Sequence, residues 1–160
     1  MKMRVGFGYD VHKLQEGKKL MLGGVVIENS PLGVVGHSDA DVLIHAIIDA
    51  LLGAANLRDI GFQYPDTDDK YKGIDSKLLL KDTLFKIKAK GYKIENIDST
   101  ISLQSPKISS YIPKMKEVLA QVLDVDIEDV SVKATTTEHL GFEGRKEGVS
   151  AYSVCLLSKE

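Results

Sequence analysis

Hydrophobic and polar positions alternate along the first dozen residues of the chain. The apolar side chains at positions 3, 5, 7, 9 and 11 alternate with polar residues and glycines, which is the period-2 pattern of a half-buried strand. Asp10 and His12 therefore project from one face of this strand. A second apolar run, Leu20 to Ile27, follows a turn near Gly17, and the two runs together predict a hairpin.

The segment from Ser38 to about Ala55 predicts a buried helix, because its apolar residues cover most of the helix circumference. One polar stripe interrupts this surface. It consists of Asp41, His45 and Asp49 at positions i, i+4 and i+8, so we expect the imidazole between two carboxylates on one helix face. Either Ser38 or Asp39 is expected to cap the helix N-terminus.

The remaining apolar periodicity predicts further elements in a mixed order. Helices are expected over residues 76–90, ended by Gly91, and from Pro113 through Val122. Strands are expected over 97–103, 130–136 and 149–157, and loops over 28–36, 56–74 and the glycine-rich stretch before the last strand.

This order contains a right-handed βαβ crossover. We therefore expect an α/β (α+β) fold with a single mixed β-sheet and helices packed on one face. The other sheet face then needs cover, which a homo-oligomer can supply.

Composition narrows the class of protein. The chain has 160 residues, 28% of them charged, and a net charge of −2, so we expect one domain over residues 1–160 and no nucleic-acid partner. Cys155 is the single cysteine, which favours a reducing, cytoplasmic setting.

No apolar run follows the basic residues at the start, and Val42 to Ala55 is too short to span a bilayer, so neither a signal peptide nor a membrane span is expected.

Asp10, His12 and His45 form the sharpest candidate for chemistry. Two imidazole nitrogens and one carboxylate oxygen, with a fourth position open, are the ligands of a catalytic zinc site. Asp41 and Asp49 are candidates for orienting the second ring nitrogen of His45. The alternative is a pair of unrelated histidines. The buried helix favours the metal site, since burying these polar groups without partners is costly.

Four further groups suit an anionic or hydroxyl-bearing ligand. His37 and Ser38 at the expected helix start can bind phosphate through free N–H groups, or form a plain cap. The loop carboxylates within residues 59–61 and 64–68 can bind hydroxyls or a second cation, or be simply solvated.

The third group is the run Ala134 to Glu138, whose hydroxyls can donate to phosphate while Glu138 suits Mg²⁺; threonines are equally ordinary in strands. Ser105, Pro106 and Lys107 can present backbone groups and an ammonium to a nucleotide, or form an ordinary approach to a helix.

Four blocks of sequence carry a resemblance to a known family. YDVH, GHSDADVLIHAIIDALLGAA, DIGFQYPDTD and KATTTEHLGFEGRKEG together resemble the 2-C-methyl-D-erythritol 2,4-cyclodiphosphate synthases of the non-mevalonate isoprenoid pathway. The resemblance implies a homotrimer with active sites between subunits. It also implies cyclisation of 4-diphosphocytidyl-2-C-methyl-D-erythritol 2-phosphate: the 2-phosphate attacks the β-phosphorus and CMP leaves, without a protein nucleophile.

The resemblance also implies roles for individual residues. Zinc is expected on Asp10, His12 and His45, Mg²⁺ or Mn²⁺ near Glu138 with the substrate diphosphate, and transition-state stabilisation from His37 and Thr136. Substrate contacts are expected from Asp10, His12, His37, Ser38, Asp59, Ile60, Gly61, Tyr64, Pro65, Asp66, Thr67, Asp68, Thr135, Thr136, Thr137, Glu138, Phe142 and Arg145. The segment Leu103, Gln104, Ser105, Pro106, Lys107, Ile108 and Ser109 resembles a cytidine-binding segment supplied by the adjacent subunit.

Three positions depart from the family pattern. Ala40 replaces a common glycine, His139 a common Lys or Arg, and Tyr152 a Glu that in some members faces the cavity at the trimer centre. Two other functions compete with the synthase. A metal-dependent phosphohydrolase would use water as nucleophile, and a zinc-stabilised trimeric module would bind nucleotides or isoprenoid diphosphates without turnover.

Overall fold

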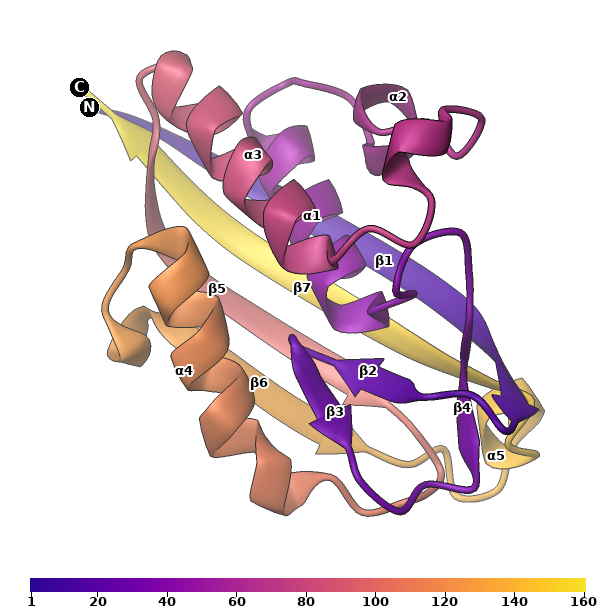
Figure 1. Cartoon of the computed structure of the whole chain (residues 1–160). Coiled ribbons are helices and arrows are strands. Elements are labelled where there is room, and N and C mark those ends of the chain that lie inside the picture. Colours follow the sequence, from indigo (N-terminus) through magenta and orange to yellow (C-terminus); the bar gives the residue numbers. More distant parts are fainter.

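A five-stranded mixed sheet forms the centre of the protein, as a computed structural model describing all 160 residues shows (Figure 1). Its strand order is β4 (Leu32–Val35), β1 (Lys2–Glu16), β7 (Gly148–Lys159), β5 (Lys93–Ser102) and β6 (Val130–Thr135). Only β5 and β6 run parallel, and the chain between them contains α4, as the expected crossover requires. Because β1 and β7 are antiparallel neighbours, the two termini lie together at one end of the molecule.

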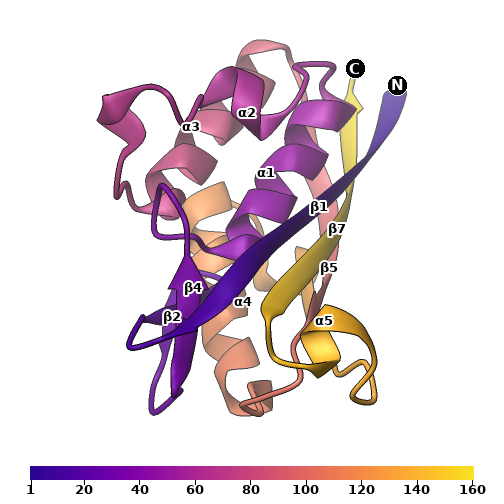
Figure 2. The same ribbon diagram turned by 90° about the vertical axis from the view of Figure 1, so that its right-hand side faces the viewer.

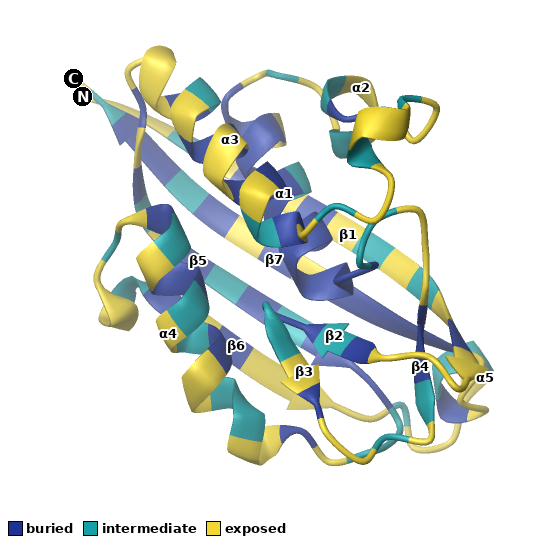
Figure 3. Ribbon diagram, viewed as in Figure 1, coloured by how far each residue is buried: buried dark blue, intermediate teal, exposed yellow.

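Three long helices cover one face of this sheet (Figure 2). They are α1 (Val42–Ala54), α3 (Ser76–Ala89) and α4 (Ile112–Leu123). Their inward side chains and those of the sheet form one continuous cluster of buried apolar residues. The ribbon segments that carry buried residues are dark blue in Figure 3. The expected one-sided α+β architecture is confirmed, and a single core holds the whole chain together.

The expected hairpin between the first two apolar runs is wrong. Residues 20–27 divide into β2 (Leu20–Leu22) and β3 (Val25–Ile27), which pair only with each other as a separate small sheet. Gly23 and Gly24 at the turn both have positive φ, a conformation that glycine adopts without strain. The long β1 pairs instead with β7 and with β4, and β4 lies inside the segment expected to be a loop.

Two other segments expected to be loops contain short helices. The connection after α1 includes α2 (Ile60–Gln63) and a 3₁₀ turn over Asp69–Tyr71, and the segment before β7 includes α5 (Gly141–Gly144). Further 3₁₀ turns cover Ser109–Tyr111 and Ile127–Asp129. These elements are three or four residues long, too short for a periodic pattern to reveal.

Helix α1 packs directly on the backbone of β1. A Cβ atom added to Gly6 would lie 1.9 Å from the carbonyl oxygen of Ala50, and one added to Gly8 would lie 1.9 Å from that of Ala46. Any side chain at these two positions would therefore force the helix away from the strand. The close approach brings His45 on the helix next to the strand face that carries Asp10 and His12.

The opposite face of β1 is apolar and open. Because the glycines face α1, the alternating apolar residues of the strand point away from the core, and they are exposed in the single chain. Tyr152 and Val154 of the neighbouring β7 extend this face. The members of this apolar sheet face are Met3, Val5, Phe7, Tyr9, Val11, Tyr152 and Val154.

Candidate metal centre and adjoining cavities

Asp10, His12 and His45 converge on one point. Oδ2 of Asp10 lies 2.9 Å from Nε2 of His12 and 3.1 Å from Nδ1 of His45, and these two nitrogens are 3.1 Å apart. Asp10 and His12 come from the end of β1 near β4, while His45 is buried on α1. The three residues that the sequence singled out are thus brought together, with one donor atom from each facing the others.

The spacing of these three donor atoms fits a divalent cation. Zinc bound to nitrogen or oxygen at about 2.0–2.1 Å in a tetrahedron separates its ligand atoms by roughly 3.3 Å, close to the three distances observed. The chemistry of the three atoms points the same way. Two imidazole nitrogens and a carboxylate oxygen that face one another at these distances need a proton or a cation between them.

The charges of the three groups are strongly linked. Burial alone would raise the pKa of Asp10, but the hydrogen bonds and charges of His12 and His45 lower it to about 2. Burial alone would lower the pKa of His12, but the hydrogen bond and charge of Asp10 raise it above 6.5. The carboxylate is thus ionised at neutral pH, as a metal ligand must be.

The expected orientation of His45 by Asp41 is wrong. Asp41 is the N-cap of α1, in place of the expected Ser38 or Asp39, and the helix begins four residues after Ser38. Its side chain accepts hydrogen bonds from the backbone N–H groups of Gly23, Gly24 and Ile44, although burial raises its pKa. Asp41 therefore ties the β2–β3 turn to the helix and leaves the imidazole to other partners.

Asp49 does not orient His45 either. Its carboxylate accepts a hydrogen bond from the backbone N–H of Ile60 at 3.0 Å and so anchors the start of α2. The second ring nitrogen of His45 faces two hydroxyls, Oγ of Ser76 at 2.8 Å and Oγ of Ser38 at 3.1 Å. The i, i+4 spacing correctly placed the carboxylates one turn away, but their hydrogen-bond partners come from distant segments.

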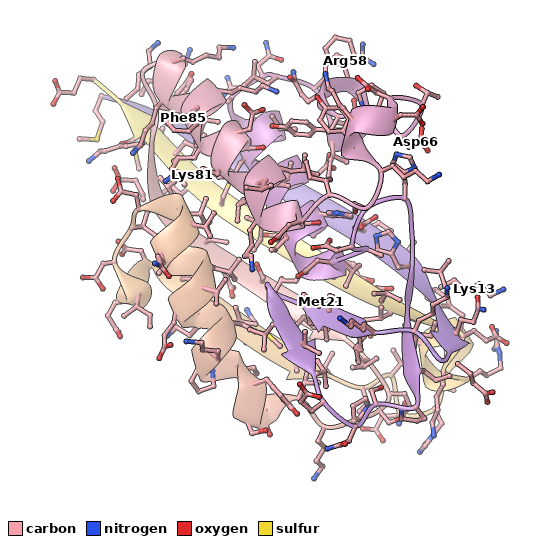
Figure 4. All side chains as sticks on the ribbon, in the orientation of Figure 1. Lys13, Met21, Arg58, Asp66, Lys81 and Phe85 are labelled. Atoms are coloured by element: carbon pink, nitrogen blue, oxygen red, sulfur yellow. The ribbon has the colours of Figure 1, made fainter.

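A cavity of about 300 Å³ opens beside the metal-ligand cluster. We call it the first cavity. It is lined by residues of the predicted site together with Tyr71 and Leu79, which sequence reasoning missed: His12, His37, Ser38, His45, Ile60, Gly61, Tyr64, Asp66, Tyr71 and Leu79. Asp66 lies on the segment after α2, on the same side of the molecule as Arg58 (Figure 4). The expected grouping of His37 and Ser38 with the α2 segment is therefore observed.

Five residues expected around this cavity do not line it, and one of them, Asp10, belongs to the metal-ligand cluster beside it. Asp59 precedes α2 and lies 3.8 Å from Arg58, while Asp68 caps the following 3₁₀ turn and pairs with Lys70. Pro65 and Thr67 lie between the lining residues of the same segment. The carboxylates of Asp59 and Asp68 therefore make local contacts within this segment and do not face the cavity.

A second cavity, of about 260 Å³, lies where β5 and β6 end. Because these strands are parallel, both of their carboxyl ends meet at this edge of the sheet. The lining residues are Leu103, Gln104, Pro106, Lys107, Ile108, Ser109, Ala134, Thr135 and Thr136. The segment expected to bind cytidine and the threonine run therefore lie together, but none of these residues lines the first cavity.

The other expected site residues stand outside both cavities. Ser105 precedes Pro106 through a cis peptide bond, and the side chain of Thr137 donates to the carbonyl of Leu140. Glu138 is exposed, its N–H donating to Thr136. Phe142 lies against Gly148, and Arg145 pairs with Glu147 at 3.1 Å.

Sequence patterns carried no signal for Tyr71, Leu79 and Ser76. Tyr71 meets Tyr64 edge to face, with ring centroids 5.6 Å apart, and Leu79 is an ordinary inward residue of an amphipathic helix. Ser76 is simply the first residue of α3. Ser76 and Leu79 acquire their places at the site only because α3 packs beside α1.

A membrane-spanning helix is not found, because no helix combines the necessary length and hydrophobicity.

Together the fold and the site define an α+β protein with a candidate divalent-metal centre at a sheet edge. The model of the YgbB family matches residues 3–158. The chain is 60% identical over 159 residues to a 2-C-methyl-D-erythritol 2,4-cyclodiphosphate synthase of Phocaeicola vulgatus, covering 99% of each chain. It therefore belongs to the family of these cyclodiphosphate synthases.

Solved structures of the family agree with this fold. The bifunctional IspDF of Campylobacter jejuni superposes with a TM-score of 0.95 at 45% identity, matching 99% of this chain and 43% of the larger protein. The IspF of Plasmodium falciparum in complex with CDP gives a TM-score of 0.87 at 35% identity, covering 99% of this chain and 97% of the other.

Proposed function

We propose that this chain, as one synthase domain over residues 1–160, converts 4-diphosphocytidyl-2-C-methyl-D-erythritol 2-phosphate to the 2,4-cyclodiphosphate and CMP. In this reaction an oxygen of the 2-phosphate attacks the β-phosphorus, and the bond from that phosphorus to the oxygen bridging the two phosphates breaks. CMP leaves with that oxygen. The observation that carries the proposal is the Asp10, His12 and His45 cluster beside a cavity, in a chain that belongs to this family.

Asp10, His12 and His45 are proposed to hold zinc, and Glu138 to contribute to a Mg²⁺ or Mn²⁺ site. When bound, such cations neutralise phosphate charge and orient the diphosphate. The support is the donor set itself, since imidazole and carboxylate suit zinc and a lone carboxylate suits the harder cations. With a net charge of −2, the chain offers no large positive field to do this work. A cytoplasmic location is part of the same proposal, in keeping with the free thiol of Cys155.

The first cavity is proposed to bind the methylerythritol and its phosphates. Ser38 and Asp66 offer a hydroxyl and a carboxylate for its hydroxyls, and His37 is proposed to stabilise the charge that develops on phosphate oxygen. The remaining proposed contacts in this region are Asp10, His12, Asp59, Ile60, Gly61, Tyr64, Pro65, Thr67 and Asp68.

The second cavity is proposed to bind the cytidine diphosphate end. Its backbone groups and the Lys107 ammonium suit a nucleotide, and the Thr136 hydroxyl suits the reacting phosphate. The CDP complex of the Plasmodium falciparum relative supports this ligand class. The other proposed contacts are Leu103, Gln104, Ser105, Pro106, Ile108, Ser109, Thr135, Thr137, Glu138, Phe142 and Arg145.

A homotrimer with sites between copies is proposed because one chain does not join the two cavities. His37 and Thr136 line different cavities of the same chain, yet both are proposed to act on one substrate. The apolar sheet face defined above is an exposed patch of the kind that marks an interface. Packing that face against neighbouring copies would cover it and let the first cavity of one copy meet the second cavity of another.

The proposal is tested by incubating purified protein with the substrate, Zn²⁺ and Mg²⁺ and following CMP. His45→Ala should release CMP about 10³-fold more slowly, if the lost cation contributes several kcal/mol. Glu138→Ala should lose its dependence on added Mg²⁺ or Mn²⁺. His139→Asn is the matched control for metal content and should retain bound zinc.

The reaction in ¹⁸O-labelled water separates cyclisation from hydrolysis. Cyclisation puts no label into CMP or the cyclic product, whereas a phosphohydrolase using water as nucleophile labels its product. A labelled or linear product would contradict the proposed function. So would CMP release by His45→Ala at the rate of the unmodified protein.

A further inference from the structure

The hydroxyl of Ser76 joins His45 to a second carboxylate that lies outside the metal-ligand cluster. Ser76 is fully buried at the start of α3, and its Oγ lies 2.8 Å from Nε2 of His45. On its other side the same hydroxyl donates to Oδ1 of Asp39. The backbone N–H of Ser76 donates to Oδ2 of Asp39 at 2.9 Å. One carboxylate therefore holds both the main chain and the side chain of this serine.

The direction of these hydrogen bonds fixes where the proton of His45 resides. A serine hydroxyl has one hydrogen to donate, and ionised Asp39 can only accept, so that hydrogen points to Asp39. The oxygen of Ser76 then presents lone pairs to Nε2 of His45, which must be the protonated nitrogen. In neutral His45 this leaves Nδ1 with a free lone pair, 3.1 Å from both Asp10 and His12.

Ser38, the other hydroxyl near Nε2, does not hold His45 in the same way. Its Oγ is farther from that nitrogen, at 3.1 Å, accepts from the N–H of Ala40, and lines the open first cavity. No carboxylate holds its hydrogen. Ser38 remains free to turn toward a ligand, whereas Ser76 is fixed by Asp39 from behind.

We propose that Ser76, held by Asp39, is a positioning residue that keeps the proton of His45 on Nε2 and so presents Nδ1 to the metal. This inference rests on the metal site of the proposed function and adds the device that prepares its most buried ligand. A partner of this kind commonly strengthens metal binding by about 10- to 100-fold, because it fixes the tautomer and the ring orientation.

The first test measures zinc affinity by competition with a chromophoric chelator at neutral pH. Ser76→Ala should raise the zinc dissociation constant about 10- to 100-fold. Asp39→Asn should raise it less, since an amide oxygen still accepts one of the two hydrogen bonds. Ser76→Ala combined with Asp39→Asn should bind no more weakly than Ser76→Ala alone, because the carboxylate acts through the hydroxyl.

Ser99→Ala is the matched control. Ser99 is also buried, and its hydroxyl donates to Ser153 at 3.0 Å, between β5 and β7. The same chemical change there should leave the zinc dissociation constant unchanged. Equal zinc affinity in Ser76→Ala and Ser99→Ala would overturn the role of Ser76 while leaving the metal site intact. Failure of the unmodified protein to bind zinc at all would overturn the metal site and this inference together.

The second test requires no substitution. In metal-free protein at a pH where His45 is neutral, ¹⁵N-detected couplings of the imidazole ring report which nitrogen carries the proton. The expected result is the Nε2–H form for His45 and a shift toward a mixture of forms in Ser76→Ala. A protein whose His45 carries its proton on Nδ1 would overturn the inference, whatever the zinc affinities.

Discussion

The two cavities of this protein differ in how far a single chain completes them. The metal-ligand cluster beside the first cavity is built from two distant segments, β1 and α1, and already has internal hydrogen bonds, buried partners and linked charges. The second cavity lies at two strand ends and is lined in part by the exposed residues Thr135 and Thr136. The contrast is that folding of one chain organises the metal site, whereas the second cavity acts together with a neighbouring copy only in the proposed assembly.

The largest expected effect tests whether the two cavities act across copies. His45→Ala and Thr136→Val should each lower the rate of CMP release by about 10²- to 10³-fold, by removing a metal ligand and a phosphate contact respectively. When the two variants are unfolded together and refolded as a mixture, a site has both groups only if its first cavity comes from a Thr136→Val copy and its second cavity from a His45→Ala copy. With equal amounts and random assembly in a closed ring, about one quarter of sites do so.

Activity of the mixture near one quarter of the unmodified rate is therefore expected. Refolding each variant alone is the control. Activity no greater than that of the separate variants would mean that both cavities of one chain serve the same substrate, and the proposed sharing between copies would be wrong.

The next effect concerns the packing that assembles the first cavity. Gly8→Ala would place a Cβ 1.9 Å from the carbonyl oxygen of Ala46, so α1 must move away from β1. We expect a loss of about 3 kcal/mol or more in the free energy of unfolding and much weaker zinc binding. Urea denaturation and zinc titration measure the two effects.

Gly53→Ala, at an exposed position of α1, is the matched control, because no atom lies within 4 Å of its added Cβ. It should stabilise the protein by about 0.5–1 kcal/mol, since alanine has the higher helix propensity. Similar behaviour of the two alanine variants would contradict the role given to the close contact of α1 with β1.

A smaller effect is the pH dependence of the metal-free protein. The pKa of Asp10 is lowered from 3.8 to about 2 in the folded state, so the folded state binds fewer protons than the unfolded state between these values. The resulting stability is present above about pH 4 and is lost as the pH falls toward 2, with a magnitude of about 2 kcal/mol at most. Urea denaturation at a series of pH values measures it, with Asp10→Asn as the comparison. An equally steep loss of stability in that variant would remove Asp10 as the cause.

The smallest effect concerns Tyr64, which lines the first cavity and is hydrogen-bonded to α3. The hydroxyl of Tyr64 lies 2.7 Å from Asp82 and 2.9 Å from Thr83 on α3. Tyr64→Phe should cost about 1 kcal/mol of unfolding free energy, because these hydrogen bonds are lost, and should raise KM more than it lowers kcat. Tyr92→Phe, at a buried ring without such partners, should change neither. A larger loss in Tyr92→Phe would contradict this account of the Tyr64 hydroxyl.

Local patterns predicted the long elements of the fold well. The apolar character of residues 42–54 reflects burial on nearly all sides, and the periodicity of residues 76–89 reflects one-sided burial. The parallel pairing of β5 and β6 follows from the helix between them. The pairing of β1 could not be predicted in the same way. Its partner β7 lies at the other end of the chain, and the Gly23-Gly24 turn diverts the nearer candidate into its own hairpin.

Residue types alone determined which groups can carry the chemistry. Asp10, His12 and His45 are metal ligands by the nature of their donor atoms, and their spacing along a strand and a helix placed them on usable faces. Only the tertiary structure decided what surrounds them. Asp41 caps a helix and Asp49 anchors the start of α2. Ser76, for which the sequence carried no signal, reaches His45 because α3 begins beside α1, and Asp39, expected only as a helix cap, holds Ser76. Hydrogen-bond partners depend on distances between segments far apart in sequence, and local periodicity carries no information about those distances.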